Sequence, residues 1–265
     1  MSASYPINIL GVIPARWASS RFPGKPLHVI AGKPLVQHVW ERCEEASALG
    51  GTIVATDDER IRQCVEGFGG RVCMTSPDHQ SGTDRVAEAA DMAGDFSHVI
   101  NVQGDEPLIA PNLINALASK LKEDITIEMI TAANPLTSDQ EFADPNVVKV
   151  VIDSAGRALY FSRSPIPYRR NDVPGLTNYR HNGIYGFRRD FLEQFVKWQP
   201  SPLELAEGLE QLRALENGVR IQVVVTHEMA LGIDTPEQVV ELEQILLGQS
   251  SSLQSNFSPS HSTTT

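Results

Sequence analysis

Apolar residues recur along the first half of the chain in short runs that alternate with helically spaced stripes. Short runs rich in Ile and Val predict strands, and apolar residues three to four positions apart predict amphipathic helices. In chain order the predicted elements are strand 7–13, helix 34–48, strand 52–56, helix 58–67, strand 72–74, helix 81–93, strand 98–103, helix 111–121 and strand 125–133. This alternation predicts an α/β fold with a mostly parallel sheet flanked by helices.

The alternation breaks after the strand at 125–133. Two further strand-like runs, 146–153 and 158–163, flank a Ser-Ala-Gly turn and predict a β-hairpin, and 179–187 predicts another strand. We therefore expect an antiparallel insertion over roughly 145–190, which would carry a second substrate and a subunit contact.

The carboxyl-terminal third returns to helix and strand. Leu205, Leu209, Leu212 and Leu215 form a stripe that predicts one amphipathic helix packed on the core. A strand at 219–226 and a helix that ends near 247 complete a single predicted domain, residues 1–248. The Ser- and Thr-rich segment 249–265 has no periodicity and is predicted to be a disordered tail.

Charge and composition narrow the function. The formal net charge is −11, which disfavours a general nucleic-acid binder, because such proteins present a basic field to phosphates. No apolar run approaches the ~20 residues needed to span a bilayer, so no membrane contact is expected. The three cysteines lack metal-type spacing and are consistent with reduced thiols. A cytoplasmic protein is predicted.

A polyanionic ligand would need a local basic site, and the loop after the first strand provides one. Arg16, Arg21 and Lys25 follow Pro14 within a short stretch of small residues, prolines and glycine. The loop fits neither a Walker phosphate loop nor a dinucleotide fingerprint, because the required glycines are absent. Three cations there would shield a triphosphate and stabilise charge on a departing phosphate. A solvated surface turn is the alternative.

Two more stretches carry candidate chemistry. Ser81 and Asp84 have the spacing of a capping box, and the free amides of such a turn can bind a phosphate or a base edge; the alternative is that they only start a helix. Asp105 follows the strand at 98–103, and ligands of open α/β sheets bind at the carboxyl ends of strands. A carboxylate there suits Mg²⁺ beside a triphosphate, whereas an aspartate in a tight turn is the alternative.

The first loop closely resembles the amino-terminal signature of the sugar-acid cytidylyltransferases, and most of all that of the 3-deoxy-manno-octulosonate (Kdo) cytidylyltransferases. The matching run is Ile-Pro-Ala-Arg-x-x-Ser-Ser-Arg-Phe-Pro-Gly-Lys-Pro-Leu, residues 13–27. Further matching runs follow in the family's order, so that the resemblance covers roughly 9–247. It implies a Rossmann-like nucleotide-diphospho-sugar transferase fold and a homodimer.

The resemblance also implies a nucleotide site for CTP. The run His-Gln-Ser-Gly-Thr beside the cytosine in this family matches residues 79–83 here, and the next two residues continue the match. The residues expected to bind nucleotide are Pro14, Ala15, Arg16, Lys25, His79, Gln80, Ser81, Gly82, Thr83, Asp84, Arg85 and Gln103. Arg16 and Lys25 are also expected to act in catalysis, by stabilising the triphosphate.

A second set of matching residues implies a sugar-acid pocket. Its expected members are Gln103, Arg163, His181, Tyr185, Glu210 and Gln211. Arg163 is the candidate partner of the substrate carboxylate, since a guanidinium forms two parallel hydrogen bonds with one. The alternatives are a protein ion pair for Arg163, a structural role for His181, and helix-surface polarity for the last two residues. Asn182 departs from the leucine common in the family, which bears on pocket shape or substrate variant.

The metal and the reaction follow from the same resemblance. The run Gln-Gly-Asp-Glu-Pro, 103–107, matches the family's metal-binding run, and Asp234 matches the second carboxylate, so both aspartates are expected to hold Mg²⁺ and to be catalytic. The implied reaction activates Kdo with CTP, giving CMP-Kdo for lipopolysaccharide synthesis. Two alternatives remain open: a relative acting on an 8-amino octulosonate or sialic acid, and a nucleotide-binding regulator without turnover.

Overall fold

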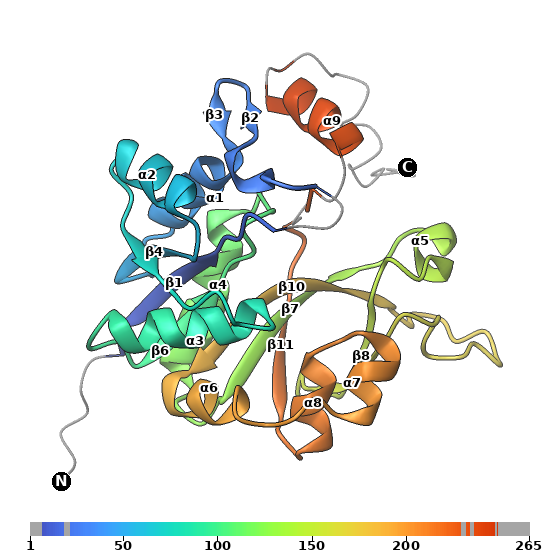
Figure 1. Cartoon of the computed structure of the whole chain (residues 1–265). Coiled ribbons are helices and arrows are strands. Elements are labelled where there is room, and N and C mark those ends of the chain that lie inside the picture. The colour runs from blue at the N-terminus through green and yellow to red at the C-terminus, as the bar shows by residue number, and fades with distance from the viewer. Residues whose placement is uncertain (1–6, 19–21, 229–231, 234–235, 247, 249–265) are drawn as a thin grey trace, which may run out of the picture.

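A twisted central sheet runs through the protein, with helices on both sides (Figure 1). The computed structural model describes residues 7–18, 22–228, 232–233, 236–246 and 248; Asp234 and the predicted tail at 249–265 lie outside them. The strands are β1 (Ile9–Pro14), β2 (Val29–Ile30), β3 (Lys33–Pro34), β4 (Gly51–Thr56), β5 (Val72–Met74), β6 (His98–Asn101), β7 (Met129–Pro135), β8 (Lys149–Ile152), β9 (Ala158–Ser162), β10 (Tyr179–Arg188) and β11 (Ile221–Val225). The helices are η1 (Lys25–Leu27), α1 (Leu35–Glu44), α2 (Glu59–Gly67), α3 (Gly82–Met92), α4 (Pro111–Glu123), α5 (Asp139–Ala143), α6 (Arg189–Phe195), α7 (Pro202–Glu207), α8 (Gln211–Glu216) and α9 (Pro236–Leu246).

The main sheet has the strand order β11-β7-β10-β6-β1-β4-β5. β1 is parallel to β4 and β6, and β7 is parallel to β11, whereas β10 runs antiparallel to both β6 and β7. The prediction of a mostly parallel sheet flanked by helices is therefore confirmed. Because β10 joins the two parallel halves, the carboxyl ends of β6 and β7 meet at one edge of the sheet.

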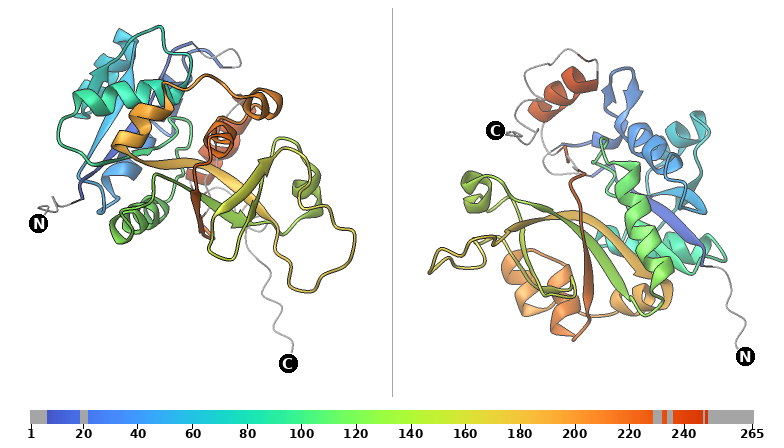
Figure 2. Two further views of the ribbon diagram at one scale, coloured as in Figure 1. Left: turned by 90° about the horizontal axis from the view of Figure 1, so that it is seen from below. Right: turned by 180° about the vertical axis from the view of Figure 1, so that it is seen from behind.

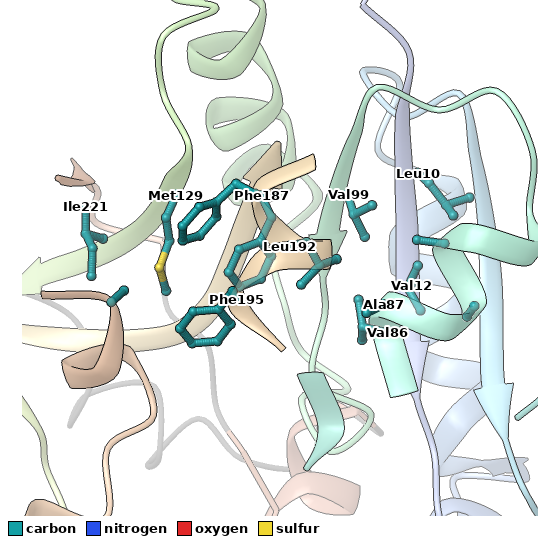
Figure 3. Packing of buried hydrophobic residues seen from close by; sticks show 14 of the residues in the cluster. Leu10, Val12, Val86, Ala87, Val99, Met129, Phe187, Leu192, Phe195 and Ile221 are labelled. Atoms are coloured by element: carbon teal, nitrogen blue, oxygen red, sulfur yellow. The ribbon is translucent and has the colours of Figure 1, made fainter. Parts of the chain in front are cut away.

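Both faces of the sheet are buried, which explains the nearly continuous apolar runs of its strands. In β1, Leu10 and Val12 pack into one hydrophobic cluster, while Ile9 and Ile13 pack into the other. Helices α3, α6 and α8 contribute to the first cluster, and α1, α2 and α4 to the second (Figure 2). In the first cluster, Figure 3 shows the rings of Phe187 and Phe195 beside Met129.

The antiparallel portion predicted at 145–190 contains β8, β9 and β10. β8 and β9 form the hairpin, and β8 also pairs with the first residues of β10. β10 then continues into the main sheet, where Tyr185 pairs with Asn101 of β6 and Thr131 of β7. The hairpin is thereby joined directly to the sheet edge at which the candidate site lies.

The prediction of a single helix from the leucine stripe is wrong. The segment forms two short helices, α7 and α8, separated by Gly208 with φ of 63°. A left-handed residue ends a helix, and glycine adopts that conformation without a steric penalty. The break turns Leu205 to the surface, where it is 70% exposed, while Leu212 stays buried. It also places Glu210 and Gln211 at the start of a new helix.

The carboxyl-terminal helix α9 packs beside the β2–β3 hairpin, next to the first loop (Figure 1). Val239 and Leu242 contact Ile30 and Ile233 in a small hydrophobic cluster. The sequence patterns did not predict this hairpin, because its strands have only two residues each. Within the described residues, none of the helices has the length and apolar character needed to cross a membrane.

Candidate functional site

A cavity of about 240 Å³, here called the basic cavity, lies at the carboxyl ends of β1 and β6. Most residues predicted to bind nucleotide line it, although Gln80, Thr83 and Asp84 do not. The lining residues are Pro14, Ala15, Arg16, Lys25, Pro26, His79, Ser81, Gly82, Arg85, Gln103, Gly104 and Asp105. The topology thus brings together three segments, 14–26, 79–85 and 103–105, and His79 of the second lies 53 positions after Pro26 of the first.

Lys25 and Asp105 are in direct contact in this cavity. Lys25 Nζ donates to Asp105 Oδ2 at 2.6 Å and to the Ile233 carbonyl at 2.5 Å. The Lys25 side chain is 12% exposed and the Asp105 side chain 34%. A mostly buried ammonium on one side of the carboxylate keeps the site compact and leaves part of Asp105 accessible to a further ligand.

The described residues supply one of the two carboxylates predicted for a magnesium site. Asp105 offers a partly exposed carboxylate at the end of β6, and its carbonyl accepts a hydrogen bond from Ile233 N at 2.8 Å. The predicted second ligand, Asp234, follows Ile233 in sequence but lies outside the described residues. Within the described part of the chain, no group of three or more His, Cys, Asp or Glu residues could hold a metal. Mg²⁺ needs only one or two protein carboxylates when phosphates supply the other oxygens.

The first turn of α3 contributes Ser81, Gly82 and Arg85 to the basic cavity. Ser81 Oγ accepts from Asp84 N at 3.1 Å and Asp84 Oδ2 accepts from Ser81 N at 3.0 Å, which confirms the predicted capping box. Asp84 is therefore occupied in the cap. The amides of a helix amino terminus attract anions and polar base edges.

Two polar side chains of the basic cavity, Arg85 and His79, make hydrogen bonds to residues that do not line the cavity. Arg85, only 4% exposed, donates to Thr75 Oγ1 and lies 3.3 Å from Asp57. His79 Nε2 is hydrogen-bonded to Glu88 of α3. The backbone amide of Ser76 is the main cause that lowers the pKa of Glu88, so this carboxylate stays ionised beside the His79 ring.

A second cavity, of about 340 Å³ and here called the aromatic cavity, lies between β10, the loop before β8 and the start of α8. Four of the residues predicted for the sugar acid line it, namely His181, Tyr185, Glu210 and Gln211. The full lining is Asn146, Val147, Val148, Arg180, His181, Gly183, Tyr185, Gly208, Leu209, Glu210 and Gln211. Arg180 and Asn146 were not predicted from the sequence.

The aromatic side chains of this cavity are uncharged near neutral pH. Burial lowers the pKa of His181 to about 3 and is the main cause that raises the pKa of Tyr185 well above its usual value. Thr131 Oγ1 lies 2.7 Å from the Ile184 carbonyl and 2.8 Å from His181 Nε2. Since the hydroxyl donates to the carbonyl, we assign the His181 proton to Nε2, which then donates to Thr131.

Two buried polar groups near this cavity lack partners among the described residues. Gln211 is 3% exposed, and its Nε2 makes no hydrogen bond within this part of the chain. Glu106 is 7% exposed and its Oε2 is likewise unpaired. Burial, and then the charge of Asp105, raise the pKa of Glu106 to about 8. A buried polar group without a partner is costly, so Gln211 marks a place for a ligand oxygen.

The two cavities are connected by side-chain hydrogen bonds. Gln103 lines the basic cavity and donates from Nε2 to the Gly183 carbonyl of the aromatic cavity at 3.1 Å. Thr83, in the first turn of α3, donates to Glu210 Oε2. Burial raises the pKa of Glu210, and the hydrogen bond from Thr83 is the first of the contacts that oppose this shift. A residue predicted for nucleotide is therefore hydrogen-bonded to one predicted for the sugar acid.

Arg163 lies behind the aromatic cavity and is absent from its lining. Its Nε donates to the Glu207 carbonyl at 2.7 Å, and its Nη1 donates to the Pro145 carbonyl at 3.1 Å. Lys149, which is fully buried, donates to the carbonyls of Arg163, Asp144 and Val147. These contacts hold the cavity wall together and leave the Arg163 guanidinium partly occupied by the protein itself.

A larger cavity, of about 620 Å³, lies at the opposite ends of β7 and β11. Lys120, Arg157 and Arg220 line it together with Asp124 and Glu128. None of the predicted site residues belongs to it, and ligands of open α/β sheets bind at the carboxyl ends of the strands. We therefore place the functional site at the two smaller, connected cavities.

Known proteins resemble this chain over most of its length. The family model described as "Cytidylyltransferase" matches residues 10–221. The 3-deoxy-manno-octulosonate cytidylyltransferase of Geobacter sulfurreducens is 52% identical over 250 residues, which cover 91% of this chain and 98% of the relative. That relative therefore aligns over almost its whole length.

Solved structures give the same result. A CMP:2-keto-3-deoxy-manno-octonic acid synthetase complexed with CTP superposes with a TM-score of 0.87 at 40% identity, covering 92% of this chain and all of that one. A 4-diphosphocytidyl-2C-methyl-D-erythritol synthase from Anaerococcus prevotii shares the fold alone, with a TM-score of 0.59 at 14% identity, covering 91% of this chain and 97% of that one. With a family model over most of its length and a relative more than half identical, this chain belongs to the 3-deoxy-manno-octulosonate cytidylyltransferase family of nucleotidyltransferases.

Proposed function

We propose that this protein transfers the cytidylyl group of CTP to the anomeric hydroxyl of 3-deoxy-manno-octulosonate. The hydroxyl oxygen bonds to the α-phosphorus, the hydroxyl proton is lost, and pyrophosphate leaves with the electrons of the broken P–O bond. The observation that carries this function is the pair of connected cavities at one sheet edge, one basic and one aromatic. The product, CMP-Kdo, would serve lipopolysaccharide synthesis.

The basic cavity would bind CTP. Lys25 and Arg16 would contact the triphosphate, where their charges oppose the charge that develops on the departing pyrophosphate. Ser81, Gly82 and Arg85 at the start of α3 would bind the nucleoside together with His79, and Pro14 and Ala15 line the same cavity. This proposal is supported by two hydrogen bonds that fix the orientation of these side chains, from Arg85 to Thr75 and between His79 and Glu88.

Asp105 and Asp234 would hold Mg²⁺ together with phosphate oxygens. Such an ion neutralises phosphate charge and lowers the pKa of a coordinated hydroxyl, so that no separate protein base is required. The protein's own part is to place the Asp105 carboxylate. Lys25 holds one oxygen of that carboxylate, and the backbone of Ile233 binds the Asp105 carbonyl. Phosphoryl transfer of this kind depends on alignment and charge neutralisation more than on a covalent residue.

The aromatic cavity would bind the sugar acid. Neutral His181 and Tyr185 would bind its hydroxyls without adding charge, and Gln211 would donate its unpaired Nε2 proton to a sugar oxygen. Glu210 would accept from a second hydroxyl. Gln103, which contacts both cavities, would keep the sugar hydroxyl near the α-phosphorus, and Arg163 would hold the wall behind it.

A homodimer is part of this proposal. The β8–β9 hairpin and the loop that follows it extend from the main body of the protein (Figure 2). This region exposes Leu159 to 60% and Tyr168 to 88%. Such side chains at the surface favour a partner of the same kind, which light scattering at enzyme concentrations would reveal as a doubled mass.

Replacing Asp105 by asparagine tests the function and its metal site together. We expect Asp105→Asn to lower Kdo-dependent pyrophosphate release by roughly 100-fold or more, because a neutral amide binds Mg²⁺ far more weakly than a carboxylate, while the fold is kept. Asp139→Asn, at an 86% exposed side chain, is the matched control and should retain activity. The wild type is assayed with Kdo, its 8-amino analogue and sialic acid.

Pyrophosphate release with Kdo and not with the other two acids would support the proposed substrate. Release with only one of the others would transfer the function to a related cytidylyltransferase. CTP binding without release on any acid would indicate a regulator. Near-normal turnover of Asp105→Asn would contradict the metal assignment alone.

A further inference from the structure

Arg180 is the one cationic side chain among the described residues that line the aromatic cavity. It lies on β10 directly before His181, in the strand that joins the two halves of the main sheet. A sugar acid brings a carboxylate, and a carboxylate leaving water needs a cation or several hydrogen-bond donors. The lining residues therefore present one obvious partner for that charge.

The surroundings of Arg180 leave its guanidinium available. Its only hydrogen bond within the described residues runs from Nη1 to Glu141 Oε1 of α5, at 3.4 Å. The Arg180 side chain is 24% exposed and that of Glu141 is 39% exposed. A guanidinium has five N–H donors, so one long contact to a half-exposed carboxylate orients it without saturating it.

Arg180 also lies close to the reacting end of the site. It lies three residues before Gly183 on β10, and Glu106, the residue that follows Asp105, reaches the same strand. Glu106 in turn lies beside β10, where a Cβ on Gly183 would stand 3.6 Å from Glu106 Oε1. A carboxylate bound to Arg180 would thus be held between the aromatic cavity and Asp105, and in Kdo the carboxylate is attached to the anomeric carbon itself.

Arg163 has a weaker claim to the same carboxylate. Two of its guanidinium nitrogens already donate to the backbone carbonyls of Glu207 and Pro145, at 2.7 and 3.1 Å. Arg163 is also absent from the lining of the aromatic cavity, whereas Arg180 belongs to it. Arg180 makes one long contact within the described residues, and its partner Glu141 is exposed enough to be solvated on its own if that contact shifts.

We propose that Arg180 binds the carboxylate of the sugar acid through paired guanidinium hydrogen bonds, and that Glu141 holds the guanidinium in place. This assignment rests on the proposed function. It makes Arg180 the residue that selects an acid over an uncharged sugar, and it leaves to Arg163 the support of the cavity wall.

A comparison of Kdo with its methyl ester tests this assignment, because the ester keeps the sugar and lacks the charge. Dissociation constants are measured by calorimetry with CDP and Mg²⁺ present, so that no turnover occurs. Wild-type enzyme should prefer the acid by roughly tenfold or more. In Arg180→Gln the acid should bind no better than the ester, with affinity for the ester unchanged. Arg163→Gln, the matched control, should retain the preference for the acid.

Arg180→Lys keeps the charge without the parallel donors, so its preference for the acid over the ester should be intermediate. This variant also tests the assignment if Arg180→Gln does not fold. An unchanged preference in Arg180→Gln, a loss of preference in Arg163→Gln alone, or no preference in the wild type would each overturn the assignment. Failure of the proposed function is a separate outcome, seen as absent pyrophosphate release by the wild type with CTP and Kdo.

Discussion

Replacing Thr83 by valine tests whether the two cavities are coupled through Glu210. Thr83 is 4% exposed, and its hydroxyl donates to Glu210 Oε2 from the first turn of α3. Valine has nearly the same shape and lacks the donor. The substitution therefore removes one hydrogen bond to a residue of the aromatic cavity and leaves the wall of the basic cavity in place.

The expected magnitude follows from the contacts of Glu210. A hydrogen bond to a charged group contributes about 1.5–3 kcal/mol, or about 10- to 150-fold in an equilibrium constant. Glu210 keeps its ion pair with Arg213, at 3.1 Å. Because a cationic partner remains, we expect the lower end of the range, a roughly tenfold rise in the KM for Kdo.

The assay is steady-state pyrophosphate release, with Kdo varied at saturating CTP and CTP varied at saturating Kdo. The KM for CTP should change by less than about twofold, since the hydroxyl is already directed at Glu210. Thr52→Val is the matched control, because the buried Thr52 hydroxyl of β4 has no partner among the described residues. Equal rises in both KM values, or an unchanged KM for Kdo, would refute the coupling.

Two further predictions concern pH and backbone packing. Burial lowers the pKa of His181 from 6.5 to about 3, so the unfolded chain takes up a proton below pH 6.5 that the folded protein refuses. The free energy of unfolding should therefore fall by up to about 1.4 kcal/mol per pH unit from this group as the pH drops from 6.5 toward 3. Urea unfolding of the wild type and of His181→Gln at pH 7 and pH 5 measures this, and the variant should lack the contribution. An identical pH dependence in both proteins would contradict the prediction. A Cβ on Gly104 would lie 2.6 Å from the Pro14 carbonyl, so Gly104→Ala should displace the first loop and lower kcat/KM for CTP by more than about tenfold. Gly67→Ala, where a Cβ meets open space, is the control, and full activity of Gly104→Ala would show that the loop adapts.

Local sequence features predicted much of the sheet and part of the basic cavity. The apolar run before Gln103 predicted a strand whose carboxyl end carries Asp105, and β6 ends at Asn101, two residues before Gln103. The spacing of Ser81 and Asp84 predicted the cap of α3, which forms as expected. Both features depend on neighbours within a few residues, so their physics is complete in a short stretch of sequence.

The leucine stripe after residue 200 shows where such reasoning fails. Helical spacing alone did not weigh Gly208, whose left-handed conformation divides the segment and sends Leu205 to solvent. A glycine inside a periodic stretch is a recognisable signal of a helix end. The helix end was therefore predictable from Gly208, whose effect opposes that of the apolar period.

Arg180 and Glu106 were missed for a different reason. Arg180 precedes His181 in a strand-like run, and its ion-pair partner Glu141 lies 39 residues away on α5. Glu106 belongs to the Gln-Gly-Asp-Glu-Pro run, and its position next to Asp105 was a usable signal. Neither the distance to a partner nor the depth of burial is encoded in a local pattern, and these two quantities give both residues their chemistry.

By itself, the sequence determined most of the alternation of strands and helices up to β7, the basic first loop, and the carboxylate at the end of β6, because each depends on apolar period, capping or charge within one short segment. Only the tertiary structure decided that β10 would enter between β6 and β7 and unite the two cavities at one edge of the sheet. It also decided that Thr83 would contact Glu210 and that Arg180 would enter the aromatic cavity. These outcomes rest on long-range strand pairing and burial, whose free energy is shared among residues far apart in the chain.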